Sequence, residues 1–276
     1  MHPGGPARHP DRSGPLGWDR APPQGGEPVI GPLTVIFTSD FHNCLTLERA
    51  GALSDLARGL PGAVLLDGGD AIRAGNAACS PLGEPVLARM TALGYAAMAL
   101  GNREFHVLPS WLRSKTRQAG FPVLAANVRP KMAGAASSFA PHALVPAGAT
   151  VLGVFGVLNV MVRAGTPWAR ISGYEFVDPV EAARTEAETL RPLCDVVVAL
   201  THCPREVALA ISELAPVDIT LAGHIHGTEV RLSAGQCYVE GDAMARTAAV
   251  VRWEPVARAA EVIRHSLDAE TEAVRP

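Results

Sequence analysis

Residues 33–70, LTVIFTSDFHNCLTLERAGALSDLARGLPGAVLLDGGD, contain the pattern that decides the fold of this chain. An apolar run at 33–38 is followed by an amphipathic segment at 46–60 and then by a second apolar run that starts at 62. Short apolar runs are typical of buried strands, and apolar residues at helical spacing are typical of a helix packed on a sheet. This strand–helix–strand order predicts two parallel strands with the helix on the outside.

The alternation continues along the chain. Helices are predicted at 84–94 and 107–120, with strands at 96–100 and 122–128. Residues 142–157 read as two strands joined at Gly148, which begin a second sheet. The later elements are, in order, a loop-rich connection at 158–176, a helix at 179–193, a strand at 195–202, a helix at 204–215, strands at 218–224, 236–241 and 247–253, and a final strand or helix at 257–267. We therefore expect one α/β domain with two sheets facing each other.

Composition limits the class of partner. The 276 residues are 48% hydrophobic, enough for a substantial core, and the net charge of −3 leaves no general attraction for nucleic acid polymers or anionic membranes. No run of about 18 or more apolar residues is present, so no spanning helix is predicted. Five cysteines without CxxC spacing argue against a disulfide framework and favour reduced thiols in a cytoplasmic protein. A small molecule is the expected partner.

The first 30 residues differ from the rest of the chain. They are rich in Pro, Gly and Arg and lack the apolar core of a secretory signal peptide. Such a composition cannot bury enough apolar surface to order itself. We expect residues 1–30 to form a disordered arm and residues 31–276 to form a single domain.

Seven side chains of the kinds that bind metals follow five of the apolar runs. They are Asp40, His42, Asp70, Asn102, His202, His224 and His226. The carboxyl ends of strands in α/β sheets are where such folds build their sites, so these side chains are expected to gather at one edge. An isolated Asp-x-His or GHIHG segment is more often an ordinary loop, but five such blocks in order predict a metal site.

The spacing of these residues suits metal binding. Asp40 and His42 lie two apart, so a carboxylate and an imidazole can approach one ion, and His224 and His226 share that spacing in a loop bounded by glycines. The preceding Gly68-Gly69 allows the chain to bend so that the Asp70 carboxylate can bridge two cations. Mixed imidazole and oxygen ligands suit two divalent ions of Mn, Fe or Zn. A bridged pair activates water and neutralises phosphoryl charge, which is what phosphate-ester hydrolysis requires.

The five blocks, in this order, resemble the calcineurin-like metallophosphoesterases. Between Leu33 and about Trp253 the chain looks most like the N-terminal catalytic domain of the 5′-nucleotidases, through GYAAMALGNREF, FPVLAANV, VLGVFGVLN and LTHCP…DITLAGHIHG. The resemblance implies two facing mixed β-sheets flanked by helices. It also implies one ion held by Asp40, His42, Asp70 and His226, and a second held by Asp70, Asn102, His202 and His224.

The chain departs from the family pattern at two positions. The family has a His after the Asn, which binds phosphate and helps to protonate the leaving group, but here that residue is Arg103. The family's Asp three residues later, which orients this His, is here His106. Arg can bind phosphate with two nitrogens but cannot act as an acid near neutral pH. His106 is either a surface residue at a helix start or a substitute acid.

The resemblance and the residues together give the functional prediction. A metal-bridging hydroxide attacks a phosphate monoester, with nucleotide-like esters as the expected substrates, while Asn102, Arg103 and His106 act at the reacting group. Arg103, Asn102 and Arg73 are the predicted phosphate-binding residues, although Arg73 is more typical of a solvated loop. The alternatives are a phosphodiesterase or a general small-molecule phosphatase, or a metal-containing module that binds a phosphorylated ligand without turnover. The 5′-nucleotidases carry a C-terminal base-stacking domain that is not expected in this chain, so weak discrimination between bases is expected.

Overall fold

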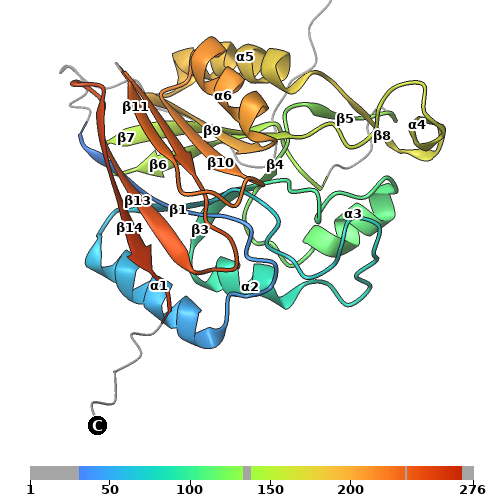
Figure 1. Ribbon diagram of the computed structural model, residues 1–276, viewed down its shortest axis with the longest axis horizontal. Helices are drawn as coiled ribbons and strands as arrows, with labels where there is room; N and C mark the ends of the chain where they lie inside the picture. Colours follow the sequence, from blue (N-terminus) through green and yellow to red (C-terminus); the bar gives the residue numbers. More distant parts are fainter. Residues whose placement is uncertain (1–30, 133–137, 234, 269–276) are drawn as a thin grey trace, which may run out of the picture.

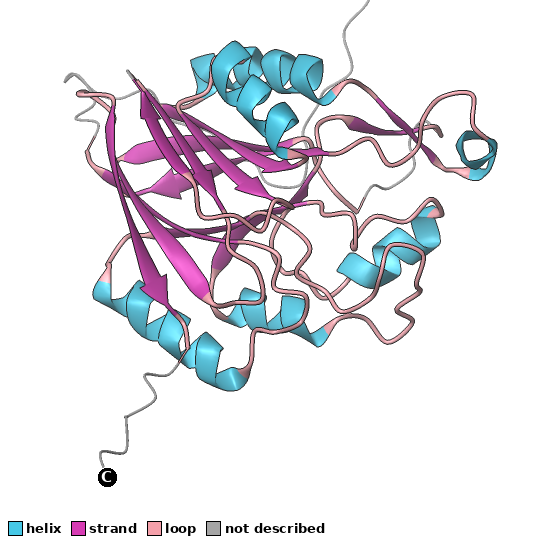
Figure 2. Cartoon of the chain, in the orientation of Figure 1, coloured by secondary structure: helices cyan, strands magenta, loops and turns pink. Residues whose placement is uncertain are grey.

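The computed structural model describes residues 31–132, 138–233 and 235–268, and the predicted arm at 1–30 lies outside them. Within this part of the chain, two large mixed β-sheets face each other and helices cover both outer faces (Figure 1; Figure 2). The predicted fold class is therefore confirmed.

The first sheet contains the N-terminal strands and the last two strands of the chain. Its strand order is β14-β13-β1-β2-β3-β4, with β1 to β4 parallel and β13 antiparallel to β1. The bounds are β1 Leu33–Thr38, β2 Val64–Asp67, β3 Tyr95–Ala99, β4 Val123–Leu124, β13 Thr247–Glu254 and β14 Ala259–Ser266.

The second sheet contains the middle of the chain, in the order β11-β12-β10-β9-β7-β6. Its bounds are β6 His142–Ala147, β7 Thr150–Leu158, β9 Val196–His202, β10 Ile219–Gly223, β11 Val230–Ser233 and β12 Gln236–Glu240. The predicted hairpin at Gly148 is present as β6 and β7, and this glycine has the positive φ of +63° that the turn requires. The strands β7, β9 and β10 run parallel.

Alternating side chains of β1 divide the core into two layers. Val35 and Phe37 point into the space between the sheets and belong to one hydrophobic cluster with Leu200 and Leu221 of the second sheet. Ile36 points to the opposite face, because successive side chains of a strand alternate. A truncation such as Phe37→Ala in this buried layer would cost about 3–5 kcal/mol of unfolding free energy.

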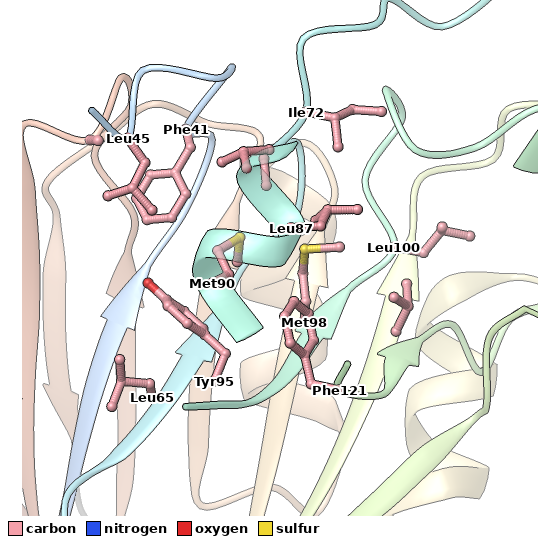
Figure 3. Close-up of a cluster of buried hydrophobic side chains, with 14 of the residues drawn as sticks. Phe41, Leu45, Leu65, Ile72, Leu87, Met90, Tyr95, Met98, Leu100 and Phe121 are labelled. Atoms are coloured by element: carbon pink, nitrogen blue, oxygen red, sulfur yellow. The ribbon is translucent and has the colours of Figure 1, made fainter. Parts of the chain in front are cut away.

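The outer face of the first sheet is covered by α1 (Leu47–Gly59) and α2 (Pro85–Ala92). Figure 3 shows Met90 of α2 beside Tyr95 and Met98 of β3 in this layer. The outer face of the second sheet is covered by α5 (Pro179–Leu190) and α6 (Arg205–Leu214), and a short 3₁₀ turn at Arg191–Leu193 follows α5 along the chain. Both faces of each sheet are thus buried along most strands.

The structure resolves or changes several sequence expectations. The ambiguous segment at 257–267 is the strand β14, which pairs with β13 over its whole length. The segment expected to be loop-rich, 158–176, also contains the helix α4 (Pro167–Ile171) and the strand β8 (Tyr174–Phe176). β8 pairs with β5 (Val128–Pro130) in a small ribbon outside both sheets. The sequence does not predict the exposed edge strand β11, because its VRLS sequence lacks an apolar run.

The remaining helix, α3 (Pro109–Thr116), follows the segment that contains Asn102 and lies on the same side of the molecule as α4 (Figure 1). The five cysteines all lie in the described part of the chain, and all are free. Among the described residues, no helix is both long and apolar enough to cross a membrane.

Candidate metal centre

The five predicted blocks meet at one edge of the two facing sheets. Asp40, Asp70 and Asn102 follow β1, β2 and β3, and His202 ends β9 while His224 and His226 follow β10. Hydrogen bonds connect the sheets at this edge, among them the His202 ring with the Gly68 carbonyl at 2.8 Å and the His224 N–H with the Asp40 carboxylate at 2.9 Å. The predicted convergence of the metal-type ligands is therefore observed.

One group of ligand atoms consists of Asp40, His42 and His226, and these atoms lie within 4.8 Å of one another. Asp40 Oδ1 is 3.2 Å from His226 Nε2 and 3.7 Å from His42 Nε2. The buried Nε2 of His42 has no hydrogen-bond partner among the described residues. A buried polar atom usually has a partner. An unpaired imidazole nitrogen that faces two carboxylates is the arrangement expected of a metal ligand.

A second group consists of Asp40, Asp70 and His202. His202 Nε2 is 3.3 Å from Asp70 Oδ1 and 3.0 Å from Asn102 Oδ1. Its other ring nitrogen, Nδ1, donates to the Gly68 carbonyl, which orients the ring and directs Nε2 toward the Asp70 and Asn102 oxygens. His224 is beside this group rather than inside it, with its ring 5.0 Å from that of His202.

Asp70, a member of the second group, also approaches the first, and Asp40 belongs to both. Its Oδ2 is 3.6 Å from His42 Nε2, and its Oδ1 faces His202. Each oxygen of one carboxylate thus points to an imidazole of a different group. This arrangement fits a bridging ligand.

The charges of the cluster favour cations. Burial raises the pKa of Asp70, but its contacts with His202 and His42 outweigh burial and leave the pKa well below its usual value. Burial likewise raises the pKa of Asp40, and its contacts with His226 and His202 bring the pKa below its usual value. Burial lowers the pKa of His202, but Asp70 reverses this and raises it to about 9. Two ionised, buried carboxylates attract positive charge, which protons or divalent ions can supply.

The backbone at the site is strained. Asp40, His42, Asp70, His224 and His226 all have positive φ, between +47° and +72°. Residues other than glycine rarely adopt this conformation, and each instance costs of order 1–3 kcal/mol. Gly69, with φ of +94°, makes the bend before Asp70, and a Cβ there would lie 2.9 Å from the Ala99 carbonyl. The surrounding structure stabilises these conformations, and they direct the ligand side chains into the site.

Glu104 supports the site, a role that the sequence pattern does not predict. It is fully buried and accepts hydrogen bonds from the backbone N–H groups of Asp70, Ile72 and Gly101. A carboxylate directly after Asn102 and Arg103 could have indicated this role, but the sequence does not show which groups it meets. Ser39, likewise not predicted, donates its hydroxyl to the Asp40 carboxylate.

Two of the predicted phosphate-binding residues lie beside the centre. The Arg103 N–H donates to Asp70 Oδ1 at 2.7 Å, and Arg103 Nε is 3.7 Å from Asp70 Oδ2. The Asn102 amide donates to Asn76 Oδ1 at 2.9 Å, while its oxygen faces His202. Arg73 is exposed and lines a different cavity of about 890 Å³ together with Arg89. Its link to the centre is through its carbonyl, which accepts from the Arg103 guanidinium.

The contacts of His106 are with other residues. Its Nδ1 accepts the Leu108 N–H at 3.0 Å, and its ring is 6.4 Å from that of Trp111. Burial and the nearby Lys115 ammonium lower the pKa of His106 below its usual value. A neutral imidazole with one nitrogen already accepting is a hydrogen-bond donor through Nε2, and it is a poor proton donor to a leaving group at neutral pH.

No protein-family model matches the chain. A 5′-nucleotidase of Bos taurus is 29% identical over 219 residues, which are 70% of this chain. The chain spans 38% of the length of that relative. Two solved structures share the fold. A 5′-nucleotidase precursor from Thermus thermophilus has a TM-score of 0.70 at 22% identity, and the match covers 85% of this chain and 54% of that one. A calcineurin-like phosphoesterase from Bacillus subtilis has a TM-score of 0.69 at 18% identity, and the match covers 86% of this chain and 91% of that one.

Proposed function

Because the chain belongs to the calcineurin-like metallophosphoesterases and is related to the 5′-nucleotidases, we propose that residues 31–268 form a catalytic unit that hydrolyses phosphoric esters with two divalent ions. The observation that carries this proposal is the position of Asp70, whose two carboxylate oxygens face His42 and His202. A single carboxylate shared between two imidazole-containing groups suits a dinuclear centre.

The donor set supports a division into two sites. Asp40, His42 and His226 would hold one ion with Asp70, and His202, Asn102 and His224 would hold the other, again with Asp70. Imidazole nitrogens mixed with carboxylate and amide oxygens suit Mn, Fe or Zn. When bound, two such ions supply Lewis acidity and neutralise charge on the phosphoryl group.

The residues around the centre would bind the phosphate. Arg103 is held beside Asp70 by its own backbone N–H, so its partly exposed guanidinium is positioned to pair with phosphoryl oxygens. Asn102 is oriented by Asn76 and would donate or accept at the same group. Nucleotide-like monoesters are the proposed substrates, supported by the names of the relatives. A phosphodiesterase or a general small-molecule phosphatase would use the same machinery.

A second candidate is a module that retains the metals and binds a phosphorylated ligand without turnover. The observation in its favour is Arg103, which occupies the position of the family's phosphate-binding histidine and cannot supply a proton near neutral pH. His106 does not replace that histidine in the described contacts, because its Nδ1 is engaged by Leu108.

The test is turnover of p-nitrophenyl phosphate, which has a good leaving group and needs no acid. The protein is stripped with chelator, reloaded with Mn²⁺, and analysed for bound metal alongside the assay. We expect about two ions per chain and turnover that returns with metal. Two bound ions with no turnover would favour the binding module, and the absence of bound metal would contradict both candidates.

A further inference from the structure

A cavity of about 380 Å³ opens beside the metal centre. It lies between the segment that follows Asn102 and the segment that leads into α4, two parts of the chain on the same side of the molecule (Figure 1). Its apolar lining comes from Phe105, Val107, Leu108, Met161, Val162, Trp168 and Ile171. A volume of about 300–1,000 Å³ with mainly apolar walls and few polar groups is typical of a small-molecule site.

Three of the lining side chains are large, apolar and exposed. Leu108 is 40% exposed, Trp168 62% and Ile171 56%. Scattered apolar residues on a surface need no explanation, but several around one cavity indicate a binding surface. Trp168 and Ile171 belong to α4, in the segment where the sequence predicted loop.

The cavity adjoins the metal centre. Asn76 lines the cavity and its Oδ1 accepts the hydrogen bond of the Asn102 amide. Phe105, another lining residue, follows Asn102 by three positions, so their Cα atoms can be at most about 11 Å apart. A turn that joins the Phe105 N–H to the Gly101 carbonyl at 3.0 Å brings them closer than this limit. A phosphate held at Asn102 can therefore carry its organic group into the cavity.

The walls suit a flat ring with polar edges. The buried Phe105 ring packs against the rings of Tyr174 and Phe176, at centroid distances of 5.8 and 5.2 Å. Trp168 supplies an exposed aromatic face on the α4 side. Asn76 adds an amide, and His106 adds an N–H donor at Nε2 because its Nδ1 accepts from Leu108.

We propose that this cavity binds the planar aromatic group of the phosphate ester, namely the base of a nucleoside monophosphate. The inference rests on the proposed hydrolytic function and names the residues that would hold the organic group of its substrate. The catalytic unit itself would then recognise the base through residues 105–108 and α4. An apolar pocket of this kind selects for the presence of a base rather than between bases, since stacking is available to every base.

The experiment compares adenosine 5′-monophosphate with ribose 5-phosphate. Both release a primary alcohol, so leaving-group protonation is matched and the base alone differs. Trp168→Ala should lower kcat/KM for the nucleotide at least about fivefold, the range that loss of one stacking contact produces, through a higher KM. It should leave ribose 5-phosphate within about twofold. Ile171→Asp, which places a charge at the apolar rim, should act in the same direction. Val256→Ala, an exposed apolar residue between β13 and β14, is the matched control.

A second measurement does not depend on catalysis. Adenosine, which carries no phosphate, is titrated into the metal-loaded protein by calorimetry, and binding should be weakened at least about fivefold by Trp168→Ala. If both sugar phosphates are hydrolysed equally well and Trp168→Ala changes neither turnover nor adenosine binding, the cavity proposal is overturned while the hydrolase stands. If adenosine binds through Trp168 but no ester is hydrolysed, the hydrolase fails and the base site remains.

Discussion

The Glu104 carboxylate accepts a hydrogen bond at 3.0 Å from the backbone N–H of Asp70. Glu104 also accepts from Ile72 and Gly101, so one side chain holds the backbone on both sides of the Asp70 carboxylate. Asp70 has a φ of +57°, a conformation that needs support from its surroundings. Glu104 is thus a positioning residue for the carboxylate that faces both His42 and His202.

Replacing Glu104 with Gln should weaken metal binding. The amide retains one acceptor oxygen but turns an NH₂ group toward backbone N–H donors, so the Asp70 loop loses part of its support. Supporting residues of this kind typically contribute about 10–100-fold in metal affinity. We expect a loss of this size in Mn²⁺ titrations, with far-ultraviolet circular dichroism unchanged. Glu84→Gln is the control, because Glu84 is a buried carboxylate that accepts the Arg73 N–H away from the ligands. Equal Mn²⁺ affinity in Glu104→Gln and wild type would contradict this role.

Asp70→Asn should reduce metal content and turnover together. A neutral amide cannot offset the charge of two dications, and its nitrogen cannot replace the oxygen that faces His42 or His202. His224→Ala should lose mainly one ion, since the His224 ring packs against the ring of His202. Elemental analysis of the two variants, run beside the aryl phosphate assay, separates these outcomes. An Asp70→Asn protein with two ions and full activity would rule out the bridging assignment.

Arg103 should make hydrolysis sensitive to the leaving group. A positioned acid typically contributes about 10²–10⁴-fold by protonating an alkoxide, and Arg103 cannot supply that proton. We expect kcat/KM to fall steeply as the leaving-group pKa rises, so that aryl esters are favoured over alkyl esters. A plot with no slope would show that protonation does not limit the reaction.

His106→Ala distinguishes two roles of that residue. As a substitute acid, His106 would matter far more for alkyl esters than for aryl esters. As a wall of the cavity, it would matter for esters that carry an aromatic group, whatever their leaving-group pKa. The lowered pKa of His106, caused by burial and Lys115, leads us to expect the second pattern. Comparing adenosine 5′-monophosphate, ribose 5-phosphate and phenyl phosphate in the variant and the wild type gives the answer.

Asp67→Asn should flatten the pH dependence of stability. Asp67 is buried at the end of β2, just before Asp70. Its carboxylate accepts hydrogen bonds from the Thr38 hydroxyl and the Gly69 N–H. Burial raises its pKa well above the usual 3.8. From about pH 4 upward the unfolded chain therefore releases a proton that the folded protein keeps, and stability falls as the pH rises toward the folded pKa. Each unit of pKa difference corresponds to about 1.4 kcal/mol.

The Asp67→Asn variant lacks this loss of stability at higher pH, because its amide does not ionise. The amide can donate a hydrogen bond to the Thr38 hydroxyl, which is also hydrogen-bonded to the Tyr95 hydroxyl. Urea denaturation of the metal-free protein from about pH 4 to about pH 8 measures the difference. The free energy of unfolding should decline less with pH in Asp67→Asn than in wild type. Asp55→Asn removes an exposed carboxylate and controls for net charge. Parallel curves for wild type and Asp67→Asn would contradict the prediction.

The sequence by itself determined the order of most strands and helices and the chemical kinds of the seven metal-type side chains. These properties belong to local stretches: apolar runs form strands, and imidazole and carboxylate groups keep their chemistry wherever they lie. The repeated placement of ligand residues after strands was enough to predict one shared edge, because the carboxyl ends of parallel strands meet there.

Tertiary structure decided what depends on partners distant in the chain. The segment at 257–267 is a strand because β13 offers it a full ladder of partners, and its own periodicity did not distinguish strand from helix. The support of Asp70 by Glu104, the direction of the His106 ring and the cavity under Trp168 all depend on packing between segments far apart in sequence. A sequence pattern carries the chemistry of each residue, but only the folded chain specifies which groups face one another.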